Sequence, residues 1–86
     1  MAYRIVVTAE ARRNLLALPK DVLRRVDACI FALARMPRPR RTKKMRGAPD
    51  LWRVRVGDYR VIYAIEDEKL LIVVIRVGHR RDVYRW

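Results

Sequence analysis

The chain has 86 residues, with 21 Lys or Arg against 9 Asp or Glu, which gives a net charge of +12 at pH 7. A chain this short forms one domain, residues 1–86, and buries only roughly 60–65% of its unfolded surface. Such a charge excess favours a polyanionic partner over a merely solubilising surface. That partner is a nucleic acid, an anionic membrane surface or an acidic protein.

Membrane attachment is the weaker interpretation, because no run approaches the roughly 18 apolar residues of a spanning helix. The first residues turn polar too soon for a signal peptide, so we expect a cytoplasmic protein. The single Cys29 cannot form an internal disulfide and is typical of a small core residue on a helix. With one His, one Cys and no helical carboxylate cluster, the sequence predicts neither a metal site nor a cofactor.

The first half of the chain predicts a strand followed by two helices. Residues 3–7 are apolar and β-branched, as in a strand, and Thr8 is a suitable N-cap for the helix that follows. Apolar residues recur at helical spacing up to Pro19, which ends that helix and suits the first turn of another. The second helix is expected to end at Met36 and Pro37. The pair is expected to form a helical hairpin lying on a sheet.

The second half predicts four strands after an exposed basic loop at residues 37–41. The expected strands cover residues 43–46, 51–56, 59–65 and 70–77, with Gly57-Asp58 as a two-residue hairpin turn. Residues 70–77 are apolar on both faces, which predicts a central strand covered on both sides. The expected fold is α+β, in the order βααββββ, with the helical hairpin packed on a small, mostly antiparallel, twisted sheet.

Strand alternation predicts an arginine-bearing sheet face. Arg53 and Arg55 alternate with Trp52, Val54 and Val56, so the arginines face solvent when the apolar residues face the helices. Arg60 follows on the next strand. If alternation continues along the last strand, three more positions share one face: Arg76, Gly78 and Arg80. Scattered solubilising arginines are the alternative to this converging cluster.

This pattern suits RNA chemistry. An arginine fork matches phosphate oxygens in a bidentate way, and aromatic side chains such as Tyr84 and Trp86 can stack on unpaired bases or can pack against the helices. The 2′-hydroxyl of RNA can attack the adjacent phosphate once it is held in line and the developing charge is stabilised. His79 and Tyr84 are the titratable groups available for proton transfer.

These residues resemble the RelE/ParE toxin superfamily, in particular its RelE branch. The resemblance runs along almost the whole chain and is most specific at residues 52–63 and 78–84. It implies a toxin that cleaves messenger RNA in the ribosomal A site and is blocked by an acidic, RelB-like antitoxin. It also implies catalytic roles for Arg53, Arg55, Arg60 and Arg80 and base stacking by Tyr84. We add His79 to this catalytic set as an available titratable group. The basic run and the C-terminal tail, independently of the resemblance, predict the RNA-binding side chains Arg38, Arg40, Arg41, Lys43, Lys44, Arg46, Arg81 and Trp86.

One departure from the family concerns the general base. Lysines can occupy the positions of Arg53 and Arg55 in the family, but arginine does not deprotonate in a protein. The two arginines can still bind phosphate and stabilise the transition state. We therefore expect His79 to accept the proton, with Tyr84 as the second candidate.

The sequence leaves three hypotheses. The first is a ribosome-dependent mRNA endonuclease of a type II toxin–antitoxin system, monomeric alone and hetero-oligomeric with its antitoxin. The second is a ParE-like inhibitor of DNA gyrase, which has the same expected fold and cleaves nothing. The third is a non-catalytic RNA-binding module, whose affinity falls steeply with salt.

Overall fold

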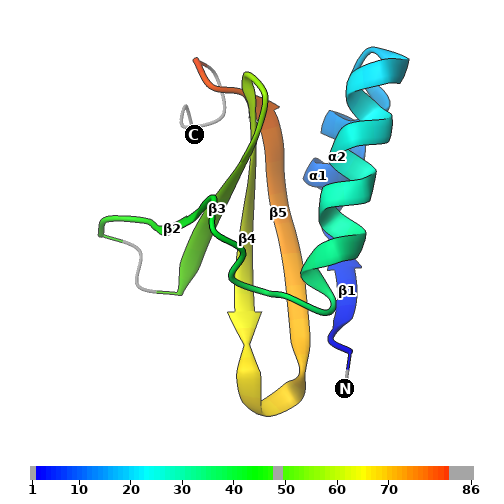
Figure 1. The fold of residues 1–86 in the computed structure, drawn as a ribbon. Coiled ribbons are helices and arrows are strands. Elements are labelled where there is room, and N and C mark those ends of the chain that lie inside the picture. The colour runs from blue at the N-terminus through cyan, green and yellow to red at the C-terminus, as the bar shows by residue number, and fades with distance from the viewer. Residues whose placement is uncertain (1, 48–49, 82–86) are drawn as a thin grey trace.

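The computed structural model describes residues 2–47 and 50–81, which form one mixed sheet with two α-helices on one side (Figure 1). The described elements in chain order are β1 (Arg4–Val7), α1 (Ala9–Leu16), α2 (Lys20–Leu33), β2 (Thr42–Lys44), β3 (Leu51–Val56), β4 (Tyr59–Glu66), a short 3-10 helix (Asp67–Lys69) and β5 (Leu71–His79). Within these residues, neither helix is long and apolar enough to cross a membrane.

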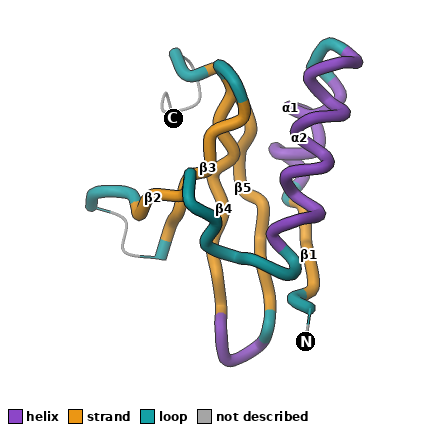
Figure 2. Tube along the Cα trace, viewed as in Figure 1, coloured by secondary structure: helices purple, strands orange, loops and turns teal. Residues whose placement is uncertain are grey.

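The sheet confirms the expected α+β fold and element order. Its strands lie in the order β1-β5-β4-β3-β2. Strand β1 runs parallel to β5, and the three other pairings are antiparallel, so the sheet is mostly antiparallel as predicted. Figure 2 shows the loop that leads from the end of α2 to β2, the strand at the far edge of this sheet.

The helices begin where the sequence predicts. Thr8 is the N-cap of α1, and its hydroxyl accepts a hydrogen bond from the backbone N–H of Ala11 at 3.1 Å. Pro19 precedes α2. The core lies between the helices and one face of the sheet. Its fully buried side chains include Ala11, Val26, Leu33, Val54, Val61, Tyr63, Ile72 and Val74.

Helix α1 covers part of the edge of β5 that β1 leaves open. Strand β1 pairs with β5 only as far as Val74. Beyond that point the Thr8 hydroxyl donates to the carbonyl of Ile75 at 2.9 Å, and the Asn14 side chain accepts from the N–H of Val77 at 3.0 Å. Two polar side chains thus satisfy backbone groups that would otherwise lie at an unpaired strand edge.

Two boundaries in the first half differ from the expectation. Helix α2 ends at Leu33, not at Met36 and Pro37, because the carbonyl of Ala34 accepts the N–H of Tyr3 at 2.7 Å instead of continuing the helix. Strand β2 spans Thr42–Lys44, whereas residues 43–46 were expected, since its ladder with β3 runs only from Val54 to Trp52.

Strand β5 also differs from the expected residues 70–77. Leu70 has a left-handed φ of 49° and belongs to the turn, while the strand continues to His79. The helices cover one face of β5 only, so the expectation of a strand covered on both sides is wrong. On the other face, Val73 is half-buried. A bulge shifts the register of β4 against β5 between Ile62 and Tyr63.

Candidate nucleic-acid interface

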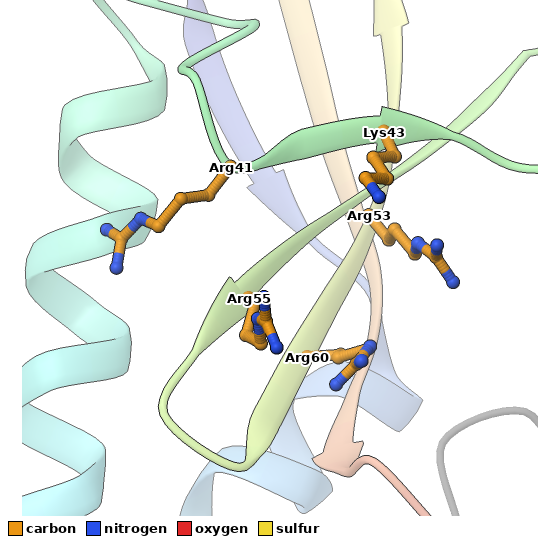
Figure 3. Close-up of a pocket in the computed structure, with 5 residues that line it drawn as sticks. All are labelled: Arg41, Lys43, Arg53, Arg55 and Arg60. Atoms are coloured by element: carbon orange, nitrogen blue, oxygen red, sulfur yellow. The ribbon is translucent and has the colours of Figure 1, made fainter.

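The face of the sheet away from the helices carries a cluster of cations. Cross-strand pairing places Lys43 beside Arg53 and Arg55 beside Arg60, which puts three neighbouring strands in contact. Together with Arg41 these side chains line a pocket of about 170 Å³, shown in Figure 3. We call it the arginine pocket and define it by Arg41, Lys43, Arg53, Arg55 and Arg60.

The arginine pocket concentrates positive charge, and the described residues that line it include no carboxylate. Within the described residues, Nη1 of Arg60 is inaccessible to solvent and has no hydrogen-bond partner. A buried cationic donor left unpaired is costly, so this side chain favours an anionic ligand. The apolar residue beside it, Ile62, is fully buried on this face between its cross-strand neighbours Arg53 and Arg76.

A buried tyrosine holds the edge of the pocket in place. Tyr63, on the helix face of β4, is fully buried, and its hydroxyl donates to the carbonyl of Pro37 at 2.7 Å. The Thr42 hydroxyl lies 2.9 Å from the hydroxyl oxygen of Tyr63. Thr42 is the donor in this second bond, because Tyr63 already donates its phenol proton to Pro37. Burial raises the pKa of Tyr63. These bonds attach the start of the basic loop and the start of β2 to the core.

Arg38 is held away from the arginine pocket. It donates two hydrogen bonds to Asp67, Nη1 to Oδ1 at 3.3 Å and Nη2 to Oδ2 at 2.8 Å, and it lies 4.9 Å from the ring centroid of Trp52. The Tyr3 hydroxyl donates to the same carboxylate at 2.6 Å. The Arg38 guanidinium holds the pKa of Asp67 below its usual value. The RNA-binding role expected for Arg38 stays a prediction.

The structure does not bring His79 together with the arginines. His79 pairs with Tyr59 and Gly78 pairs with Arg60, so the imidazole lies on the opposite face from Arg60. Its ring contacts Tyr59 edge-on, with 5.5 Å between centroids. Nδ1 accepts the backbone N–H of Arg81 at 3.3 Å, which places the proton of the neutral imidazole on Nε2.

The other expected site residues are spread around the pocket. Arg80 is exposed, and its N–H donates to the carbonyl of Asp58 at 2.8 Å, which places its backbone beside the β3–β4 turn. Lys44 pairs with Trp52, on the face opposite Lys43. Tyr84 and Trp86 lie outside the described residues. The remaining expected RNA-binding side chains are exposed: Arg40, Arg46 and Arg81.

Sequence reasoning missed the residues that support the site. Tyr63 sits in an apolar strand and reads as an ordinary core residue, while Tyr3 and Asp67 are separated by 64 positions. The one available signal was Asp67, an acid in a turn of a strongly basic chain, where a cation partner is expected.

Comparison with known proteins gives the same fold and family. A family model described as "ParE toxin of type II toxin-antitoxin system, parDE" matches residues 4–84. Toxin RelG of Mycobacterium tuberculosis is 37% identical over 86 residues, covering 99% of each chain. The mRNA interferase toxin RelE of Escherichia coli is 30% identical over 88 residues, covering 98% of this chain and 92% of that protein.

Solved structures agree. The toxin in the archaeal RelE-RelB complex from Pyrococcus horikoshii superposes with a TM-score of 0.83 at 32% identity, covering 96% of this chain and 100% of that one. The RelBE2 complex of Mycobacterium tuberculosis contains a chain with a TM-score of 0.82 at 36% identity, covering 93% and 100% respectively. A two-helix hairpin packed on a five-stranded sheet with a cationic open face therefore defines the chain as a RelE/ParE-type toxin. The chain belongs to the ParE toxin family of type II toxin–antitoxin systems and is of the RelE type.

Proposed function

We propose that this toxin is a ribosome-dependent endoribonuclease that cleaves messenger RNA in the A site and thereby stops translation. The observation that carries the proposal is the arginine pocket, in which a buried guanidinium nitrogen of Arg60 has no partner among the described residues. A phosphodiester supplies the anion that this nitrogen lacks. The name of the Escherichia coli relative, an mRNA interferase, supports the same chemistry.

In the proposed reaction the RNA supplies its own nucleophile. The 2′-oxygen forms a bond to phosphorus while the bond to the 5′-oxygen breaks, leaving a 2′,3′-cyclic phosphate, which can open to a 3′-phosphate, and a 5′-hydroxyl. Arg53, Arg55 and Arg60 hold the phosphate and stabilise the charge that builds on its oxygens. Arg80 is assigned to stabilise the charge on the leaving 5′-oxygen, which takes its proton from water because arginine does not deprotonate. No step requires a metal ion, because cationic side chains neutralise this charge.

The proposed reaction also needs a group that accepts the 2′-hydroxyl proton. Arginine cannot accept the 2′-hydroxyl proton, and His79 lies on the other face of the sheet. The proposal therefore moves this role from His79 to Tyr84, the second candidate in the sequence. Stacking of the adjacent base is also assigned to Tyr84, as the family resemblance implies.

The proposed partner is an acidic, RelB-like antitoxin that covers the cationic face in a hetero-oligomer, the toxin alone being monomeric and cytoplasmic. The solved relatives are RelE–RelB complexes, and the net charge of +12 favours an anionic partner. If a small acidic protein is encoded next to this toxin, co-expression of the two should yield a stable complex that suppresses toxicity.

The test is to incubate purified toxin with messenger RNA, with and without programmed ribosomes, and to map new RNA ends by primer extension. The proposal predicts cleavage within the A-site codon only when ribosomes are present. The family description also names ParE, which favours gyrase inhibition as the second candidate. Inhibited supercoiling with intact RNA would support that candidate, and RNA binding without new ends would indicate a non-catalytic module.

A further inference from the structure

A second hollow, of about 420 Å³, lies between α2 and the β3–β4 hairpin. We call it the helix–hairpin groove. Its floor is apolar, formed by Ala28, Ala32 and Val56, and two cations line it, Arg25 from α2 and Arg41 from the basic loop. An apolar floor flanked by guanidinium groups offers a surface for a flat base and charges for the phosphates on either side of it.

Arg41 connects this groove to the arginine pocket, because it lines both. In Figure 3 its side chain extends toward α2, while the other four labelled side chains lie on the strands of the open face. The charge of Arg41 also reaches the thiol of Cys29 on α2, where it partly opposes the rise in pKa that burial causes. A polyanion leaving the arginine pocket on this side would therefore meet Arg41 first.

Arg25 lies at the other side of the groove, against the hairpin turn. Its Nη1 and Nη2 atoms are each 3.6 Å from the position that a Cβ would occupy on Gly57. Gly57 has a φ of 59°, as its turn requires, so the backbone there presents no side chain to the guanidinium. The salt bridges formed between described residues join Arg38 to Asp67 and Arg76 to Glu10, and neither involves Arg25 or Arg41.

We propose that the helix–hairpin groove binds the RNA segment adjoining the nucleotide held in the arginine pocket, with Arg41 and Arg25 contacting successive phosphates and a base lying on the apolar floor. This inference rests on the proposed function and extends it from one phosphate to a path along the strand. Continuity through Arg41 favours RNA over an acidic peptide, because a strand in the pocket must continue beyond it.

The test compares the binding of a dinucleotide and an octanucleotide of 2′-O-methyl RNA, which lacks the nucleophile and stays intact. Fluorescence anisotropy is measured for the wild-type toxin, for Arg25→Ala and for the control Arg24→Ala, which removes the same charge from an exposed neighbour on α2. Arg25→Ala should lose one phosphate contact. The slope of log affinity against log salt concentration for the octanucleotide should then become shallower by about 0.7, which corresponds to about fivefold weaker binding at 0.1 M salt. Dinucleotide binding should be unchanged.

A second variant tests the floor without altering charge. Ala28→Leu places a larger side chain in the groove and should weaken octanucleotide binding while the salt slope stays at the wild-type value. Circular dichroism confirms that each variant is folded. Ala28 is exposed on α2, so the substitution disturbs no buried contact.

Wild-type octanucleotide affinity and salt slope in Arg25→Ala would overturn the inference, and so would an equal loss in Arg24→Ala. A weaker antitoxin complex with unchanged RNA binding in Arg25→Ala would assign the groove to a protein and also overturn it. A failure of the proposed function would give a separate result, in which Arg60→Ala leaves the binding of both oligonucleotides unchanged.

Discussion

Arg60 and His79 lie on neighbouring strands at the same end of the sheet, yet their side chains project from opposite faces. Arg60 pairs with Gly78, and His79, one position further along β5, pairs with Tyr59 instead. The one histidine in the sequence is thus separated from the arginine pocket by the sheet itself. Because arginine cannot act as a base, proton transfer must come from another group.

The first prediction concerns this separation. His79→Ala should cleave ribosome-bound RNA at nearly the wild-type rate, because the imidazole contacts Tyr59 and its Nδ1 accepts the N–H of Arg81. Tyr84→Phe should lose most of its activity, since it removes the proposed proton acceptor and keeps the ring. Single-turnover rates on programmed ribosomes provide the measurement. A large loss in His79→Ala with normal folding would return the general-base role to the histidine.

The second prediction concerns the buried hydroxyl of Tyr63. Tyr63→Phe removes the donor to the carbonyl of Pro37 and the acceptor for Thr42, so unfolding free energy should fall by about 1–2 kcal/mol. For a domain of this size that lowers the melting temperature by roughly 4–8 °C per kcal/mol. Urea denaturation followed by circular dichroism measures the effect. Tyr59→Phe is the matched control and should be near neutral, and an equal loss in both variants would contradict the account.

The third prediction concerns the contact between Asp67 and the basic loop. Asp67→Asn replaces the carboxylate that accepts two hydrogen bonds from Arg38, so the loop should detach more often. Limited trypsin digestion should then cut residues 38–41 faster than in the wild type, as mapped by mass spectrometry. Glu68→Gln, a change of the same charge at an exposed neighbouring position, is the control. Equal digestion of both variants and the wild type would show that Asp67 does not hold the loop.

The fourth prediction gives the pH dependence of the same contact. Hydrogen bonds from Arg38 and Tyr3 lower the pKa of Asp67 in the folded protein. A lowered folded-state pKa means that the contact contributes stability above the unfolded value of about 3.9, and that this contribution is lost as pH falls through the folded-state pKa. Carboxyl 13C NMR titration should give a midpoint below that of an unfolded Asp, and Arg38→Ala should raise it. An unchanged midpoint in Arg38→Ala would contradict the assignment.

The parts of the fold that depend on local patterns were predictable from the sequence. Alternation over residues 51–56 is enough to place Val54 and Val56 in the core and Arg53 and Arg55 on the open face. The Thr8 N-cap and the break at Pro19 are signals contained within a few residues. The α+β class and the order of elements follow from such signals taken one after another.

Non-local relationships could not be predicted in this way. The face of His79 relative to Arg60 depends on the register between β4 and β5, which local alternation does not fix. Arg38 looked like any other cation of the basic loop, because its partner Asp67 lies 29 positions away. The position of Arg41 beside α2 is also non-local, since only the path of the folded chain brings the basic loop next to that helix.

The most direct test of the account is the single-turnover rate at which Arg60→Ala cleaves messenger RNA on programmed ribosomes. Arg60 lines the arginine pocket, and its buried Nη1 has no hydrogen-bond partner among the described residues. Losing one preorganised donor to the transition state should reduce the rate by about 100-fold or more, while the variant stays folded. Cleavage at the wild-type rate by a folded Arg60→Ala toxin would contradict the claim that the phosphate reacts in this pocket.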